Sequence, residues 1–170
     1  MTESGTAPES PPWWTWRSDA GPVKPGPAVV FDLDGVLSDA AGRQHYLAGL
    51  RRDWDAFFEA CGTDPVVPEV ARMLELFDAS LVVILLTARP ARVRPQTVEW
   101  LTRYGLRYDL LVMREHGNYA PADKFKQRET RALIDYGFDI RLAVEDDPRN
   151  LEMFDREGIP CLYVHSGYYG

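Results

Sequence analysis

The sequence predicts an α/β fold, a Rossmann-like three-layer sandwich with helices on both faces of a central, mostly parallel sheet. Three observations predict it. From residue 28 onward, short apolar runs rich in β-branched residues alternate with segments of helical periodicity. Polar or acidic residues directly follow several of these runs, where the ligand crevice of an open α/β sheet lies. The chain has 170 residues, 45% of them hydrophobic, which suits one domain and leaves no room for a second.

Five apolar runs are the predicted strands. Each has the length of an ordinary strand and stands between polar or turn-forming residues. They are residues 28–33, 81–86, 108–112, 140–144 and 160–164.

Helices are predicted between these strands. Apolar residues recur at i, i+3, i+4 and i+7 in Val70, Met73, Leu74 and Phe77, on a helix from about Val67 to Ser80. A later helix is marked in the same way by Phe125, Ala132, Leu133 and Tyr136. A further helix is predicted after the fourth strand. Asp147 is its expected N-cap, Pro148 its first helical residue and Gly158 its C-terminal stop.

Residues 1–27 have a different composition from the predicted domain at 28–170. They contain six prolines with several Gly, Ser and Glu, which cannot build a core of their own, so a tail is expected. Trp13, Trp14 and Trp16 are costly to leave in water and should dock on something. Docking across the domain's own surface is favoured over a partner site.

Charge and cysteine content exclude several classes of protein. Nineteen Lys and Arg against 26 Asp and Glu give a net charge of −7, which argues against coating nucleic acid through an overall basic field. Cys61 and Cys161 are far apart, so neither a disulfide scaffold nor a zinc site is indicated. No apolar run approaches membrane-spanning length and no signal peptide is recognised. We expect a cytoplasmic protein without membrane contact.

Two carboxylates end the first predicted strand. Asp32 and Asp34 stand at i and i+2, so both side chains face one spot if the chain stays extended. Two carboxylates held so close together repel one another unless a cation lies between them. Hard oxygen ligands such as these favour Mg²⁺. The alternative is that Asp34 and Gly35 form a turn, with Asp32 a polar residue at the strand edge.

Three further groups follow other strands or open a helix. Thr87 and Arg89 follow the second strand and suit a phosphate, although a turn hydroxyl and a surface charge are the alternatives. Lys124 and Lys126 open a helix, and Lys124 is the better candidate for an ordinary surface lysine. The fourth strand ends in acids, of which Asp147 is explained as a helix N-cap, whereas Glu145 and Asp146 are not.

With these residues in order, the chain resembles the haloacid dehalogenase superfamily of phosphohydrolases over about residues 28–165. Phe31 to Val36 looks like the first motif, Thr87 the second, Lys126 the third and Glu145-Asp146 the fourth. The resemblance implies Mg²⁺ and an aspartyl-phosphate intermediate. Asp32 would be the nucleophile, Asp34 the general acid and base, and Thr87 and Lys126 would bind phosphoryl oxygens. The metal ligands would be Asp32, the Asp34 main-chain carbonyl, Asp146 and, directly or through water, Glu145.

The predicted cap over the active site is minimal. Between Asp34 and Thr87 only a short flap at about residues 38–64 remains once the helix is counted, and Thr87 to Lys126 already holds a helix and a strand. An open site follows, which a bulky or polymeric phosphate could reach unless a partner subunit of an oligomer covers it.

A closer resemblance is to the phosphatase half of polynucleotide kinase-phosphatases, which act on the 3′-phosphates of nucleic acid ends. It is carried by Gly42-Arg43, by Arg89, and by a tail pattern of Glu145-Asp146, Glu152-Met153-Phe154, Gly158, Cys161 and Ser166-Gly167. It implies that Arg43 and Arg89 bind the substrate phosphate or its neighbour. The chain has no G-x-x-x-x-G-K-[ST] loop, so ATP use is not expected.

Two alternatives remain open at this point. The same chemistry could act on a nucleotide or another small phosphate ester. A protein of a different class, a catalytically silent binding module that recruits a partner through Trp13 to Trp16, is disfavoured because all the motif residues are present.

Overall fold

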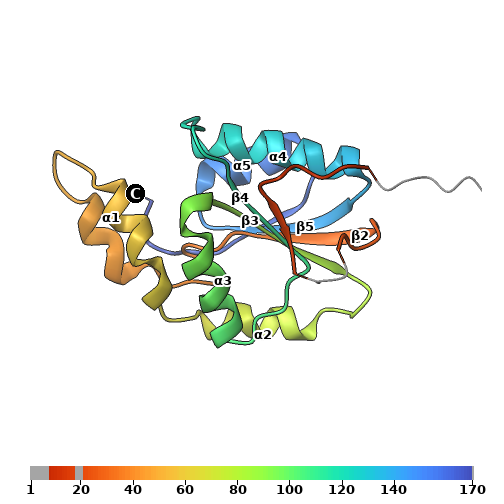
Figure 1. The fold of residues 1–170 in the computed structure, drawn as a ribbon, viewed down its shortest axis with the longest axis horizontal. Coiled ribbons are helices and arrows are strands. Elements are labelled where there is room, and N and C mark those ends of the chain that lie inside the picture. The colour runs from red at the N-terminus through yellow and green to blue at the C-terminus, as the bar shows by residue number, and fades with distance from the viewer. Residues whose placement is uncertain (1–7, 18–20, 170) are drawn as a thin grey trace, which may run out of the picture.

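The computed structural model describes residues 8–17 and 21–169 and contains one mixed sheet (Figure 1). Its strand order is β1-β4-β3-β2-β5-β6. All neighbouring strands pair in parallel except β1, which is antiparallel to β4. The strands are β1 (Trp14–Trp16), β2 (Pro27–Phe31), β3 (Val82–Pro90), β4 (Leu110–Arg114), β5 (Asp139–Glu145) and β6 (Cys161–Tyr163).

Helices cover both faces of this sheet, which confirms the predicted fold class. Figure 1 shows α2 and α3 on one face and α4 and α5 on the other. The helices are η1 (Ala41–Leu47), α1 (Trp54–Glu59), η2 (Ala60–Thr63), α2 (Pro68–Leu76), η3 (Ala91–Val93), α3 (Arg94–Arg103), α4 (Ala122–Tyr136) and α5 (Pro148–Arg156). None of the helices in the described ranges is long and apolar enough to cross a membrane.

The central strands have apolar side chains on both faces because each face is covered. In β3, Val83 and Leu85 belong to the hydrophobic cluster under α2 and α3, whereas Val82, Ile84 and Leu86 belong to the cluster under α4 and α5. Continuous apolar runs are typical of such parallel strands. This double burial fixes the sheet and therefore the positions of the residues that follow its strands.

Several predicted boundaries are wrong by a few residues: the strand predicted at 81–86 runs on to Pro90, and the one predicted at 28–33 ends at Phe31. Two others have clear local reasons. The helix predicted to end near Ser80 ends at Leu76, because the Asp78 carboxylate accepts hydrogen bonds from the backbone N–H and hydroxyl of Ser80 and forms a turn there. The strand predicted at 108–112 begins at Leu110, because the Asp109 side chain accepts a hydrogen bond from the backbone N–H of Val83.

The tryptophan segment, which the sequence places in a tail, contributes a strand to the sheet. Residues 14–16 pair with β4, and Trp14 is only 5% exposed. The indole N–H groups of Trp13 and Trp14 donate to the two carboxylate oxygens of buried Glu129, at 3.1 and 2.8 Å. Trp16 packs against Tyr136 and Phe138. The docking surface of these tryptophans is thus the domain itself; residues 1–7 and 18–20 lie outside the described chain.

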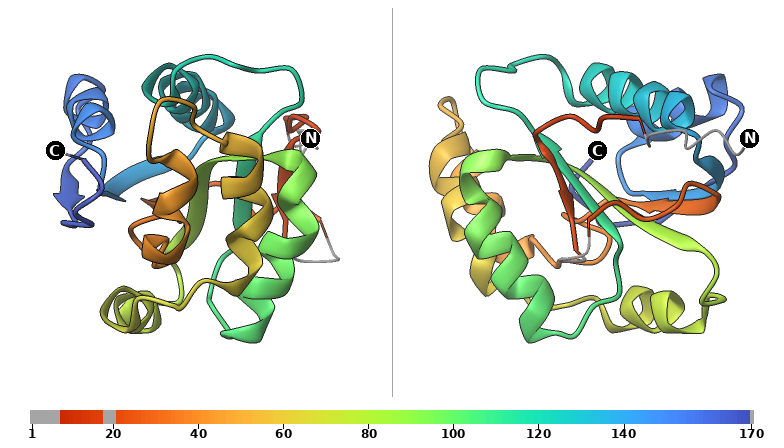
Figure 2. Two further views of the ribbon diagram at one scale, coloured as in Figure 1. Left: turned by 90° about the vertical axis from the view of Figure 1, so that its left-hand side faces the viewer. Right: turned by 45° about the vertical axis from the view of Figure 1, so that its right-hand side comes forward.

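The segment expected to form the flap contains three short helices, η1, α1 and η2. The left view of Figure 2 looks at the molecule from the side on which this segment lies. Ser38 at its start forms isolated bridges to Asp34 and Val66, which hold both ends of the segment together. The flap therefore rises from the edge of the sheet where β2 and β3 end.

Candidate active site

The parallel strands bring the predicted motif residues to one edge of the sheet. Phe31 at the end of β2 pairs with Leu85 of β3 on one side and with Val144 of β5 on the other. Asp32 therefore stands level with Leu86 and Glu145, and Thr87 and Asp146 each follow by one residue. Three motifs that are far apart in the chain meet here for this reason.

A buried acidic cluster is formed by Asp32, Glu145 and Asp146. One oxygen from each lies within 4.8 Å of the others. Lys126 reaches the cluster from α4, with Nζ 3.0 Å from Asp32 Oδ1 and 2.7 Å from Glu145 Oε2. One lysine among three carboxylates leaves an excess of negative charge in a place from which water is largely excluded.

This excess negative charge shifts the pKa values of the groups in the cluster. Burial, and then the nearby Glu145 carboxylate, raises the pKa of Asp32 well above its ordinary value. Burial, and then Asp32, raises the pKa of Asp146 to about 7. Burial opposes protonation of Lys126, but Asp32 and Glu145 outweigh it and raise the pKa of the amine, so the lysine stays charged.

The donor set fits a divalent cation. Neither side-chain oxygen of buried Asp146 has a hydrogen-bond partner among the described residues. Unpartnered carboxylate oxygens are costly in a protein interior, and a bound cation would satisfy them. Carboxylate oxygens are the ligands that Mg²⁺ prefers.

Gly35 is required by the shape of the same cluster. Its φ of +83° is strained for other residues, and a Cβ there would lie 2.0 Å from Asp146 Oδ2. From the sequence, a simple turn at Asp34 and Gly35 is an alternative to a functional site. In the structure this turn is part of the site.

Asp34 is held by two buried arginines. Arg89 Nη2 lies 2.7 Å and Arg43 Nη2 2.6 Å from Asp34 Oδ1, and Arg89 Nε lies 3.1 and 3.2 Å from the two oxygens. Burial alone would raise the pKa of Asp34, but the two guanidinium groups lower it to about 2. Arg43 and Arg89 are 3% and 0% exposed, so the alternative of surface arginines is wrong.

Asp64 is a site residue that the sequence analysis missed. Its two oxygens accept hydrogen bonds from Arg43 Nε at 2.8 Å and Nη2 at 2.6 Å, and the Ser38 hydroxyl donates to one of them. Asp64 follows η2 in the flap segment, 30 positions after Asp34, and stands in no recognisable motif. We call Asp34, Arg43, Asp64 and Arg89 the arginine clamp.

We expect Asp64→Asn to weaken the arginine clamp. The amide keeps one acceptor but loses the charge that balances the second guanidinium, which should lower stability by about 2 kcal/mol. Displacement of Asp34 should lower kcat by about 10- to 100-fold. Thermal unfolding and steady-state phosphatase kinetics measure the two effects.

Asp55→Asn, which removes an exposed ion pair to Arg92, is the control and should change neither the stability nor kcat by much. Equal behaviour of both variants would refute a positioning role for Asp64.

The remaining predicted residues are divided between the site and its surroundings. Thr87 and Arg89, which were expected to follow the second strand, lie within β3, three residues and one residue before its end at Pro90. Thr87 is buried, and its hydroxyl oxygen accepts the Arg89 backbone N–H at 3.1 Å. Lys124 is exposed, unlike Lys126, and does not share its contacts in the acidic cluster. Tyr168, which the sequence analysis did not single out, donates its hydroxyl to Asp39 Oδ1 at 3.1 Å and so ties the C-terminal segment to the start of the flap.

Comparisons with known proteins agree with this site. A family model described as the polynucleotide kinase PNKP phosphatase domain matches residues 26–169. Two structures described as the Pnkp1/Rnl/Hen1 complex, one of them as an RNA repair complex, are similar at 26% and 28% identity, both with a TM-score of 0.70. The matches cover 96% and 88% of this chain but 47% and 48% of those chains, so the chain spans about half their length.

A more distant structure shares the fold. It is a putative HAD-like phosphatase from Mesorhizobium loti, at 15% identity and a TM-score of 0.56, with 91% of this chain and 80% of that chain covered. The family match extends over the whole sheet apart from β1 and includes every residue of the acidic cluster and the arginine clamp. The chain therefore belongs to the family of PNKP phosphatase domains, and it is a phosphatase of the haloacid dehalogenase type.

Proposed function

We propose that this phosphatase depends on Mg²⁺, acts through an aspartyl-phosphate intermediate and removes 3′-phosphates from nucleic acid ends. The observation that carries the proposal is the position of Asp32, which lies between Lys126 and two further carboxylates at the sheet edge. A phosphate ester adds about two negative charges to this cluster at neutral pH. A cation is needed before a carboxylate can approach it.

The chain offers four groups to hold the metal: Asp32, Asp146, the main-chain carbonyl of Asp34 and Glu145. Glu145 is already bound to Lys126 at 2.7 Å, which favours contact with the ion through water. When bound, Mg²⁺ neutralises charge on the phosphate and on the attacking carboxylate.

Asp32 supplies the nucleophile. Its oxygen forms a bond to phosphorus as the bond from phosphorus to the 3′ oxygen breaks, and water then cleaves the aspartyl-phosphate to free phosphate and the carboxylate. Lys126 binds a phosphoryl oxygen. The Thr87 oxygen accepts the Arg89 N–H, and its hydroxyl donates to no other described residue, so the hydroxyl hydrogen can be donated to another phosphoryl oxygen.

Asp34 is the proposed general acid and general base. A pKa of about 2 keeps it ionised, as a base requires when it takes a proton from the attacking water. Its acid role needs a proton that the substrate can bring, because phosphate monoesters have a second pKa of about 6. Arg43 and Arg89 were expected to bind the substrate phosphate; because both contact Asp34, we propose that they act by positioning this side chain.

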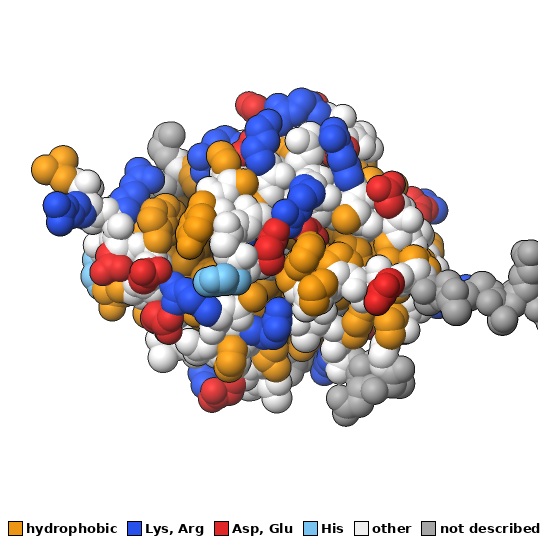
Figure 3. All heavy atoms as spheres, turned by 45° about the horizontal axis from the view of Figure 1, so that its top comes forward, with side chains coloured by type: hydrophobic (Ala, Val, Ile, Leu, Met, Phe, Trp, Pro, Cys, Tyr) orange, Lys and Arg blue, Asp and Glu red, His pale blue; other side chains and the backbone are white. Residues whose placement is uncertain are grey.

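Nucleic acid ends are favoured as substrates by the family and by the small flap. The relatives described as an RNA repair complex make RNA ends the first choice. In Figure 3, Lys and Arg side chains on the face that carries α4 are interspersed with acidic and hydrophobic ones, so binding there must use local contacts. The binding-module alternative loses its support, because the indole N–H groups of Trp13 and Trp14 are both bound within the domain.

The experiment is phosphate release by the purified protein from 3′-phosphorylated RNA and DNA oligonucleotides. Nucleoside 3′-monophosphates and 5′-phosphorylated oligonucleotides are run beside them, each with Mg²⁺ and with EDTA. We expect Mg²⁺-dependent release with the highest kcat/KM on the 3′-phosphorylated oligonucleotides. A preference for the monophosphates would replace this proposal with a nucleotidase.

The metal site can also be tested without turnover, through thermal stability. With a pKa near 7 in the folded state against 3.8 when unfolded, Asp146 holds a proton between these pH values that the unfolded chain has released. In EDTA the melting temperature should therefore fall as pH rises from 5 to 7. Mg²⁺ displaces this proton, so its stabilising effect should grow over the same range.

Asp146→Asn is the control for that measurement. The amide does not titrate and is a poor ligand, so both the fall in EDTA and the gain with Mg²⁺ should shrink. An unchanged gain with Mg²⁺ in this variant would exclude Asp146 as a metal ligand.

A further inference from the structure

The loop of residues 115–121 links β4 to α4 at the edge where the active site lies. Val112 of β4 stands level with Leu86 and therefore with Asp32. At about 3.3 Å per residue and 4.8 Å between strands, the loop begins about 10 Å beyond Asp32 and about 10 Å to its side. It leads into α4, which carries Lys126 into the acidic cluster.

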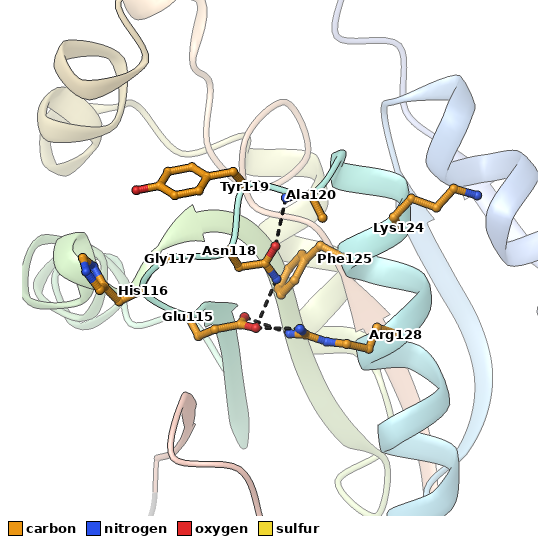
Figure 4. Close-up of a pocket in the computed structure, with 9 residues that line it drawn as sticks. All are labelled: Glu115, His116, Gly117, Asn118, Tyr119, Ala120, Lys124, Phe125 and Arg128. Atoms are coloured by element: carbon orange, nitrogen blue, oxygen red, sulfur yellow. Dashed lines mark hydrogen bonds and ion pairs between the residues drawn. The ribbon is translucent and has the colours of Figure 1, made fainter.

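This loop and the start of α4 line a shallow pocket of about 380 Å³ that is open to solvent (Figure 4). Its lining contains none of the acidic cluster, so it lies beside the reacting groups. Phe125, the residue before Lys126, is one of its walls. The other side chains that the argument uses are Glu115, His116, Tyr119, Lys124 and Arg128.

Tyr119 is an exposed aromatic residue in a loop that is held in place. Its exposed fraction is 89%. On one side of it, Asn118 donates to Glu115 at 3.1 Å and accepts the Ala120 backbone N–H at 2.9 Å. Glu115 is in turn bound to Arg128 of α4 at 2.6 Å. The ring is therefore presented to solvent by a loop tied to α4, and no aromatic contact or hydrogen bond of the ring with another described residue explains why it is aromatic.

The exposed ring of Tyr119 suits a nucleobase. An aromatic face stacks any base, and in Figure 4 this ring points outward from the loop, away from Phe125 and Arg128, which leaves its face open to one. Arg128 is bound to Glu115 and Glu129, whereas Lys124 is exposed and extends to the side opposite Tyr119 in Figure 4. Its charge favours a phosphodiester of the same strand rather than the stacked base itself.

We propose that loop 115–121 is a nucleobase subsite, in which Tyr119 stacks a base close to the 3′-phosphate. The proposal rests on the proposed function and names the part of the substrate that separates an oligonucleotide from a small phosphate ester. From the position of the loop, the base lies within about four nucleotides of the phosphate at the 3.4 Å rise of a stacked strand.

The kinetic test compares Tyr119→Ala with wild type on two kinds of 3′-phosphorylated oligonucleotide. One kind is complete, and the other lacks a single base at one of the last four nucleotides. We expect Tyr119→Ala to raise KM on the complete strand by about 5- to 150-fold with kcat little changed. On the strand that lacks the stacked base, wild type and variant should have the same KM. Tyr119→Phe should behave as wild type.

Leu76→Ala is the matched control, because Leu76 is 77% exposed but ends α2 near the start of β3, at the opposite edge of the sheet. It should leave KM unchanged on every substrate. The subsite is refuted if Tyr119→Ala lowers activity equally on complete and base-lacking strands, or if it leaves KM on the complete strand unchanged.

A binding measurement separates failure of this subsite from failure of the proposed function. In the Asp32→Asn protein, 2-aminopurine placed at each of the last four positions of the oligonucleotide should be quenched at one position, and Tyr119→Ala should abolish the quenching. Quenching by Tyr119 with no preference for oligonucleotides in turnover would overturn the 3′-end function and keep the subsite. Preferred turnover of oligonucleotides without quenching at any position would keep the 3′-end function and overturn the subsite.

Discussion

Asp32→Asn is expected to abolish phosphatase activity, with kcat lower by at least about 10⁴-fold. The amide cannot form the aspartyl-phosphate, and it removes one of the oxygen ligands proposed for Mg²⁺. Lys126 and Glu145 would still be paired at 2.7 Å, so the surroundings of the lost nucleophile should persist. Single-turnover phosphate release from a 3′-phosphorylated oligonucleotide is the measurement.

The fold should survive this substitution. In the absence of metal, Asp32 is one of three crowded carboxylates, and burial and Glu145 disfavour its charge. Replacing it with a neutral side chain of the same shape should leave the melting temperature in EDTA equal or higher. Residual activity close to wild type, in a preparation shown free of wild-type protein, would remove Asp32 as the nucleophile.

Trp14→Ala is expected to be the most destabilising single substitution outside the site, by about 3–5 kcal/mol. Trp14 is buried in the cluster under α4, packs against Tyr136 with tilted rings at 5.4 Å between centroids, and donates to Glu129. Its removal leaves a cavity and takes away one of the donors that satisfy a buried carboxylate. For a domain of this size, the melting temperature should fall by about 2–4 °C per kcal/mol.

The control for this prediction is Thr15→Ala, which removes a half-buried side chain from the same strand. It should cost much less than Trp14→Ala. Activity measured well below the melting temperature should be retained in both, because β1 lies at the far side of β4 and β3 from Asp32. A small effect of Trp14→Ala would mean that β1 adds little to the stability of the sheet.

The sequence determined the reacting groups and their order along the sheet. Continuous apolar runs require a doubly covered parallel sheet, and residues that follow parallel strands must meet at one edge. Asp32, Thr87, Glu145 and Asp146 could be selected for this reason, and the four motifs in order identified the superfamily.

Only the tertiary structure decided what the arginines contact. Arg43 and Arg89 are 46 positions apart, and their partners depend on how the flap folds back over β3, which no local periodicity encodes. Asp64 entered the site through the same packing, as did Tyr119, whose loop lies beside the site only because β4 is parallel to β3.

The tryptophan strand shows the same division. Composition indicated that three indoles would leave water, since their apolar area makes exposure costly. It could not indicate where they dock, because the acceptor is Glu129, more than a hundred residues away. Local sequence thus fixes which groups must be buried or charged, whereas contacts between distant segments depend on the packing of the whole chain.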